Sequence, residues 1–456
     1  MAPRLLNKRN ILSITCGMGL AAGYSIAHAS GFQLIEQSVS GMGTAYAGGA
    51  AEASDATTVY FNPAGLTELN GTQGIAGVHI VIPQAEFTNK GSTFAPLLGG
   101  APLSGGNGGD GGETGVVPHL YFSHRYSDSL VLGLGINAPF GLTTEYDNGW
   151  VGRYHALKSE VKTININPAI GYSVNDRISV GAGINYQYID AELTNAIDFG
   201  SIGALSGQPL APGSQDGHVR VSGDDWSWGY NLGLLIKADE QTRIGIHYRS
   251  EIKHTLSGDA DFTVPANPIV AALATGLNLV DTNVESRVKL PATISLSAFH
   301  QLNDQWAIMA DVSRTDWSSL QELRFKFGSG AENGVSTQLA WEDSIRVSAG
   351  ASYKPQSSGW ILRGGIAHDQ TPIPNEKYRT PRIPGNDRIW LALGAGYHLS
   401  DSFSFDIGYA HLFVDDPLIE KVADPFGNVE NLTRGALKGE YDASVDIVSA
   451  QLRWVF

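Results

Sequence analysis

The sequence predicts an all-β fold in which about fourteen antiparallel strands close into a transmembrane barrel. Three features predict it: side chains that alternate between apolar and polar, connections that alternate between short and long, and no apolar run long enough for a spanning helix. At the C-terminus, Leu452, Trp454 and Phe456 form one apolar strand face. Gln451 and Arg453 face the other way. A barrel needs such a final strand, which must pair with the first strand while presenting an apolar face to lipid.

Residues 1–29 have the pattern of a secretory signal peptide. A basic start and an apolar core over 11–22 precede Ala27-His28-Ala29, which is typical of a cleavage site. The mature chain is therefore expected to begin at Ser30. The one cysteine, Cys16, lies in this leader, so the mature protein must be stable without disulfides.

The composition argues against several functions. The formal net charge is −15, and an acidic chain repels the phosphate backbone, so nucleic acid is not expected as a partner. The histidines form neither an H-E-x-x-H motif nor a close cluster, and no cofactor or metal is predicted. No G-x-S-x-G motif is present, so the chain is not expected to be an enzyme and no catalytic residue is assigned. A barrel hydrolase that assembles its triad from separate strands is the remote alternative.

Short and long connections alternate along residues 73–456, the predicted barrel domain. Because this rhythm gives an even strand number, both chain ends are expected on the periplasmic side. A soluble β-sandwich or propeller also alternates, but it does not explain this rhythm beside a signal peptide. The short turns lie at 127–129, 175–177, 239–241, 303–305, 356–358 and 400–402. The long loops lie at about 87–115, 141–160, 196–218, 257–284, 328–338, 370–385 and 414–438.

Residues 30–72 do not follow the barrel pattern. They are rich in Gly and Ala, they alternate poorly, and they precede the first clear strand at about 74–87. Composition leaves two interpretations open, a plug inside the barrel and a flexible periplasmic segment.

Several separated motifs resemble one known family. The mature start, Ser30-Gly31-Phe32-Gln33-Leu34, is followed by Gly41-Met42-Gly43-Thr44-Ala45 and by Asn62-Pro63-Ala64. Further stretches are Pro139–Tyr146, Tyr248–Lys253 and Asp387–Leu391. Together they resemble the FadL family of outer-membrane long-chain fatty acid transporters, including its aromatic-hydrocarbon relatives of the TodX and XylN type. The resemblance covers essentially the whole mature chain.

The resemblance implies a monomeric fourteen-stranded barrel in the bacterial outer membrane, plugged by an N-terminal hatch (residues 30–72) inside the lumen. It implies that a hydrophobic ligand is caught between outer loops, enters an interior pocket and leaves sideways into the surrounding lipid, near lipopolysaccharide. By resemblance, Asn62, Pro63 and Ala64 are candidates for residues near the side opening. Phe32 is the candidate to reach the interior pocket and to move when ligand binds.

Pro139, Phe140 and Gly141 are candidates for a kink in the third strand. Proline has no N–H to donate to the ladder, so Pro139 disrupts pairing locally. Two interpretations remain open, a kink within the strand and a simple strand end.

The head-group site is harder to predict. A carboxylate ligand favours a basic partner, and Arg249, Lys289 and Arg346 lie in or near predicted strands. For Arg249 and Lys289, alternation suggests a face opposite the apolar one. At the end of the fifth strand, where a cation could bind a carboxylate, the sequence contains only Glu192, Thr194 and Asn195. The absence of a basic residue there favours an uncharged ligand.

The sequence therefore predicts a passive transporter, most simply of long-chain fatty acids. The alternatives are uptake of aromatic or aliphatic hydrocarbons by the same route, and a general diffusion porin. Trp226, Trp306, Trp317 and Trp454 are expected in the interfacial aromatic girdles, although Trp317 is also a candidate for the ligand path.

Overall fold

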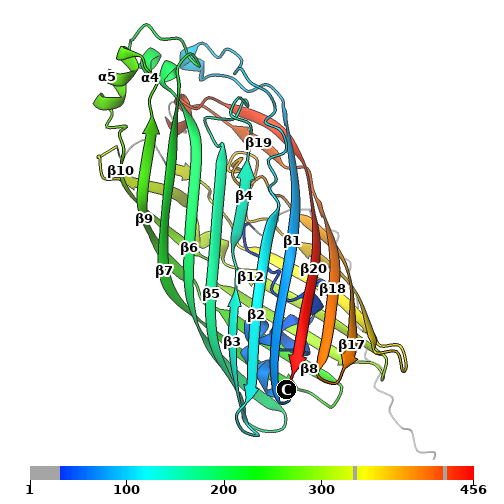
Figure 1. Cartoon of the computed structure of the whole chain (residues 1–456). Coiled ribbons are helices and arrows are strands. Elements are labelled where there is room, and N and C mark those ends of the chain that lie inside the picture. Colours follow the sequence, from blue (N-terminus) through cyan, green and yellow to red (C-terminus); the bar gives the residue numbers. More distant parts are fainter. Residues whose placement is uncertain (1–30, 332–335, 425–428) are drawn as a thin grey trace, which may run out of the picture.

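The computed structural model describes residues 31–331, 336–424 and 429–456. The predicted signal peptide, residues 1–29, lies outside the described residues. In the described part of the chain, twenty strands form one closed antiparallel sheet (Figure 1). None of the helices in these ranges is long and apolar enough to cross a bilayer.

The twenty strands occupy fourteen positions in the barrel wall. Five of these positions consist of two consecutive segments each, namely β3 with β4, β8 with β9, β10 with β11, β12 with β13 and β14 with β15. The short strand β19 is an addition to the wall and pairs only with β20. The strands are β1 (Thr72–Asn89), β2 (Gly115–Arg125), β3 (Leu130–Asn137), β4 (Gly141–Glu145), β5 (Lys158–Ser173), β6 (Ile178–Asp198), β7 (Asp216–Lys237), β8 (Thr242–Arg249), β9 (Ile252–Thr263), β10 (Thr282–Leu290), β11 (Thr293–Gln301), β12 (Trp306–Thr315), β13 (Glu322–Phe327), β14 (Ser336–Gln338), β15 (Ser344–Tyr353), β16 (Trp360–Asp369), β17 (Arg388–Ser400), β18 (Phe403–Val414), β19 (Leu418–Lys421) and β20 (Leu437–Val455).

The last strand closes the wall against the first. Gly74 of β1 pairs with Trp454 of β20, and the ladder continues to Asn89 opposite Gly439. The predicted pairing of the C-terminal strand with the strand that begins near Gly74 is therefore confirmed. Short turns gather at one end of the barrel, which we call the turn end, and the C-terminus lies there (Figure 1). The opposite end, the loop end, carries α4 (Phe199–Leu205) and α5 (Pro268–Gly276).

Two faces of the wall differ in the half of the barrel near the turn end. Isoleucine, leucine and valine side chains alternate along the strands and are exposed on the outer face, for example Ile244 and Ile246 of β8. Aromatic rings border this apolar outer face. Trp226 and Trp228 of β7 stack on Tyr186 with ring centroids 4.4 and 4.1 Å apart. This pattern is typical of a wall that faces lipid.

The N-terminal segment, residues 31–71, lies inside the barrel. It contains α1 (Val39–Met42), α2 (Gly49–Glu52), α3 (Thr58–Phe61) and the 3₁₀ helix η1 (Pro63–Glu68). Inward-facing glycines of the wall allow it to approach the strands. A Cβ on Gly245 would overlap the backbone of Ala50, and one on Gly181 would overlap Ala64. Further 3₁₀ helices are η2 (Pro96–Leu98), η3 (Trp317–Ser319) and η4 (Val429–Leu432).

Polar contacts bind the internal segment to the closing strand. Gln451 donates from Nε2 to Asp55 Oδ2 at 3.4 Å and accepts from the amide of Val39 at 3.1 Å. Arg453 donates to the carbonyl of Ser54 at 3.2 Å. These inward side chains therefore face protein, as expected from the alternation of the C-terminal strand.

Candidate functional site

The third wall strand is interrupted. β3 ends at Asn137, β4 begins at Gly141, and both pair with β5. Because the strand resumes, Pro139 interrupts it and does not end it. Beyond the break, the described chain shows no pairing between β2 and β4, since β2 pairs with β3 only from Leu120 onward. The wall therefore has an unpaired gap between residues 115–119 and residues 138–143, which closes again where Gly112 pairs with Thr144.

The internal segment satisfies the backbone groups at the break. The amide of Leu34 donates to the carbonyl of Pro139 at 2.9 Å, and that of Gly141 donates to Phe32 at 3.1 Å. Gln37 donates from Nε2 to the carbonyl of Ala138 at 2.8 Å. Backbone groups at membrane depth need such partners, because lipid offers none. The break is thus stabilised by residues 32–37.

A large cavity, which we call the side cavity, begins at this break. Its volume is about 970 Å³. On its inner side it is lined by Arg346 and Trp390. It is also lined by Val116, Ile136 and Ile164, whose side chains are exposed on the outer face of the wall. The side cavity therefore connects the lumen with the apolar outer face.

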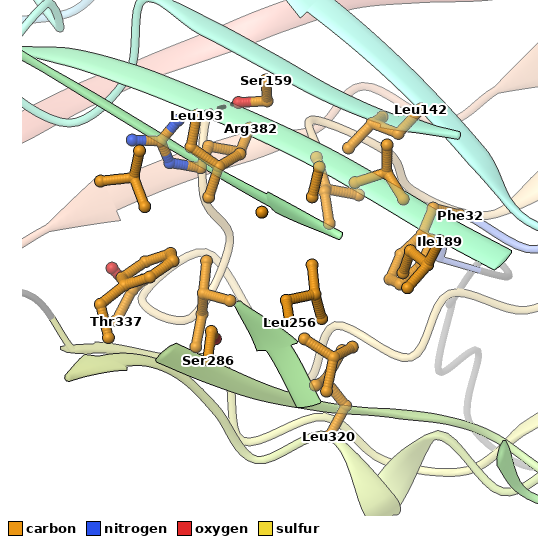
Figure 2. A pocket seen from close by; sticks show the side chains of 18 of the residues that line it. Phe32, Leu142, Ser159, Ile189, Leu193, Leu256, Ser286, Leu320, Thr337 and Arg382 are labelled. Atoms are coloured by element: carbon orange, nitrogen blue, oxygen red, sulfur yellow. Dashed lines mark hydrogen bonds between the residues drawn. The ribbon is translucent and has the colours of Figure 1, made fainter. Parts of the chain in front are cut away.

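A second, narrower cavity of about 100 Å³ lies among apolar side chains, and we call it the apolar cavity (Figure 2). Its lining includes Ile189, Leu193, Val221, Leu256, Val284, Val288, Leu320, Leu323, Phe325 and Leu339. These residues come from β6, β7, β9, β10 and β13, from the connection between β12 and β13, and from the connection between β14 and β15. Alkyl chains favour such a lining, because burial removes their surface from water.

Phe32 lies at the boundary of the two cavities and lines both. Its ring packs against Trp317, Phe140 and Trp341 at centroid distances of 5.1, 5.8 and 6.1 Å. The preceding Gly31 has φ of +56°, and a Cβ there would lie 2.7 Å from the Trp317 ring. Only a glycine fits this close approach without strain. Trp317 is fully buried, so its predicted place in an aromatic girdle is wrong.

Arg382 supplies a cation to the apolar cavity. Figure 2 places it beside Ser159, at the end opposite Phe32. It donates to Ser159 Oγ at 2.9 Å, to the carbonyl of Thr194 at 3.3 Å and to Asn195 Oδ1 at 3.2 Å. Among the described residues, no carboxylate oxygen lies within ion-pair distance of Arg382. Burial lowers the pKa of Arg382 to about 9, which leaves it protonated at neutral pH.

The sequence does not reveal Arg382. At the end of the fifth strand, where a cation was expected, the local sequence contains only Glu192, Thr194 and Asn195. The cation reaches that place from the loop between β16 and β17, far away in the sequence. The only available signal was the polar pair Thr194 and Asn195, which now serve as hydrogen-bond acceptors for the guanidinium.

The three predicted head-group residues lie in different places. Arg249 and Arg346 face inward and line the side cavity. Lys289 is exposed on the outer face, so its prediction as a lumen cation is wrong. The strand that contains Lys289 is interrupted between Leu290 and Thr293. Because of this interruption, the apolar side chains of β10 point inward, whereas those of β11 point outward.

Asn62, Pro63 and Ala64 do not contact the break. Asn62 donates from Nδ2 to the carbonyls of Leu234 on β7 and of Ala50, at 3.0 and 2.6 Å. A Cβ on Gly181 of β6 would overlap Pro63 and Ala64. This motif therefore fixes the internal segment to β6 and β7, and residues 32–37 take the place beside the break. Among the described residues, no cluster of His, Cys, Asp and Glu has the arrangement of a metal site.

The fold and the cavities define a β-barrel channel with an internal segment and an opening in its side wall. The chain belongs to the family described as outer membrane protein transport protein (OMPP1/FadL/TodX), whose model matches residues 20–456. The family consists of β-barrel proteins of the bacterial outer membrane that transport hydrophobic compounds.

Individual relatives agree with this assignment. An outer membrane protein of Neisseria meningitidis serogroup B is 32% identical, and the match covers 100% of both chains. A long-chain fatty acid transport protein of Escherichia coli O6:H1 is 31% identical over 85% of this chain and 87% of that protein. The crystal structure of a Pseudomonas aeruginosa FadL homologue has a TM-score of 0.85 at 25% identity and covers 94% of this chain and 100% of that one.

Proposed function

We propose that this protein carries long-chain fatty acids passively across the polar outer layer of the membrane. The acid enters from the loop end, fills the apolar cavity with its carboxylate at Arg382, passes Phe32 into the side cavity and leaves through the gap beside β4. The observation that carries this proposal is the guanidinium of Arg382 at one end of a mainly apolar cavity, with no carboxylate within ion-pair distance among the described residues.

The physical chemistry of the ligand fits this route. Each buried CH₂ gains about 0.8 kcal/mol on leaving water, so an apolar cavity binds a long chain without an energy source. Apolar side chains at the loop end, including Leu205 at the end of α4 and Leu277 after α5, are exposed and offer a first contact. Lateral release then delivers the chain directly into lipid, where its transfer is again favourable.

The cation distinguishes acids from hydrocarbons. A hydrocarbon would gain from the apolar lining but would leave Arg382 without an anionic partner. A carboxylate would accept charge-assisted hydrogen bonds from it. Uptake of aromatic or aliphatic hydrocarbons by the same route remains the second candidate, supported by the mainly apolar lining of the rest of the cavity.

We further propose that residues 30–72 act as a plug, that the loop end faces outward with both termini in the periplasm, and that the protein is monomeric and has no enzymatic activity. Packing of α1 to η1 against the inner wall supports the plug and speaks against a general diffusion porin. Outer-membrane lipid and lipopolysaccharide are its expected surroundings.

Two experiments test the function. A strain that lacks the gene should lose growth on oleate, regain it with the wild-type gene, and grow normally on toluene and alkanes. Unchanged growth on oleate, or loss only on hydrocarbons, would contradict the acid as substrate. In liposome swelling assays, the purified protein should admit sugars no faster than protein-free liposomes, and rapid entry would favour the porin.

A further inference from the structure

Arg346 is a buried cation in the side cavity with few partners. It lies on the inner face of β15 and is 6% exposed. Its Nη2 donates to the carbonyl of Ala45, in the internal segment, at 2.9 Å. Within the described ranges, its Nε and Nη1 have no hydrogen-bond partner and no carboxylate lies within 4.0 Å of it. A buried guanidinium with unused donors is costly unless an anion joins it.

Aromatic rings hold this guanidinium in place. It lies over Trp390 at 5.2 Å from the ring centroid and over Tyr46 at 5.8 Å. Cation–π contacts stabilise the charge without using its N–H groups. The unused donors therefore remain available to a ligand in the cavity that Arg346 lines.

Two other arginines and a buried aspartate of the side cavity already have partners. Arg388 lies 3.5 Å from Asp369, and Asp311 accepts a hydrogen bond from Ser297. Arg249 donates to Asn185 and, at 3.1 Å, to the carbonyl of Tyr60. Glu36, in the internal segment, is buried and lines the same cavity. Of the three arginines, Arg346 thus offers the most open donors to an incoming anion.

The side cavity is also amphipathic. Arg346 and Trp390 form its inner wall, and Val116, Ile136 and Ile164 border it at the outer face. We propose that Arg346 is a second binding site for the ligand carboxylate, which holds the head group while the alkyl chain passes through the gap into lipid. This inference rests on the proposed function. It implies that an acid leaves tail first, whereas an uncharged analogue passes without a stop.

Quenching of Trp390 tests this site. Hexadecanoic acid brominated at carbon 2 carries a heavy-atom quencher next to the carboxylate, and the analogue brominated at carbon 16 carries it at the tail. With the full protein in liposomes, the difference between wild type and Trp390→Phe isolates the Trp390 signal. We expect the 2-bromo acid to quench this signal and the 16-bromo acid and the 2-bromo methyl ester to quench it much less.

Variants separate charge from structure. Arg346→Gln should weaken quenching of Trp390 by the 2-bromo acid about tenfold, the loss expected for a charge-assisted contact. Arg346→Lys should restore most of it. Lys289→Gln, which removes an exposed cation, is the matched control and should change nothing. Heat-modifiable mobility in gels confirms that each variant is folded.

The outcomes distinguish this site from the proposed function. If the 16-bromo acid still quenches the tryptophans around Phe32 but no acid quenches Trp390, the second site is wrong and the transport route is untouched. Equal quenching of Trp390 by acid and methyl ester, or no effect of Arg346→Gln, would also overturn it. If no brominated acid quenches any inward tryptophan, the proposed function fails with it.

Discussion

The two halves of the barrel wall have opposite polarity. Near the turn end, β6 points Asn185 inward and Ile184 outward. Near the loop end, the same strand points Ile189 inward, and its outward Glu192 forms an ion pair with Arg220 at 2.7 Å. The surroundings of each face explain the difference. Near the turn end, the outer face contacts lipid and the inner face contacts a polar internal segment, so apolar side chains point outward. Near the loop end, the outer face contacts water and the inner face surrounds an apolar ligand, so apolar side chains point inward.

The wall achieves this inversion in two ways. In β6 the strand is continuous, and the apolar residues change from even to odd positions after the girdle residue Tyr188. Between β8 and β9 the apolar residues stay at even positions, but the chain changes face. Ile246 is exposed, whereas Leu256, beyond the interruption at 250–251, is buried in the apolar cavity. Breaks in the wall therefore reverse polarity without a change in the sequence pattern.

The largest expected effect comes from reversing the polarity at one position of the loop-end half. Ile189→Asp places an unpaired carboxylate in the apolar cavity, and we expect fatty acid binding to weaken about 100-fold. Its neighbour Asp190 faces outward, so Asp190→Ile should leave binding unchanged. Equilibrium binding of a fluorescent fatty acid to the purified variants measures both. Equal losses in the two variants would refute the assignment of the faces.

A second prediction concerns the internal segment in the turn-end half. Gly364 and Gly365 are adjacent in β16, but only Gly365 faces inward, where a Cβ would overlap the backbone of Thr44. Gly365→Val should displace the internal segment, at a cost of about 1–3 kcal/mol for overpacking, and admit sugars in liposome swelling. Gly364→Val meets only Leu393, at 3.9 Å, and should stay closed. Sugar entry through neither variant would contradict the blocking role of this segment.

The sequence alone predicted the barrel fold, but it did not predict Arg382, the cation of the apolar cavity. Alternation and loop lengths predicted the barrel, and the closure at Gly74 followed from them. Alternation alone does not tell which face of a strand points into the lumen. Lys289 was therefore predicted to face the lumen, although a break in its strand leaves it on the outer face. Arg382 was invisible because a loop brings it beside Thr194 through tertiary structure, which no local pattern encodes.

A third, smaller effect compares two arginines beside the end of β6. Arg382 lies inside the barrel, and Arg220 lies outside, bonded to Glu192 at 2.7 Å. Arg382→Met should weaken binding of a fatty acid about tenfold and leave that of its methyl ester unchanged, since only the acid uses the charge. Arg220→Met should affect neither ligand, because exposed ion pairs contribute little. Equal weakening for acid and ester would show that Arg382 acts by packing alone.

The smallest effect concerns Glu36, whose burial raises its pKa to about 6. The charged groups around it are Arg388 and Arg346, which favour its ionised form, and Asp369, which opposes it. As the pH falls through 6, Glu36 gains a proton, and the side cavity becomes more positive. A long-chain alkyl sulfonate, which stays ionised throughout, should then bind about two- to threefold more tightly at pH 5 than at pH 7.5. Glu36→Gln should reduce this pH dependence, because the amide is always neutral, and the remainder is expected from Asp311, another buried carboxylate that lines the side cavity. A pH dependence as large as that of the wild type would assign the titration to another group and separate Glu36 from the anion site at Arg346.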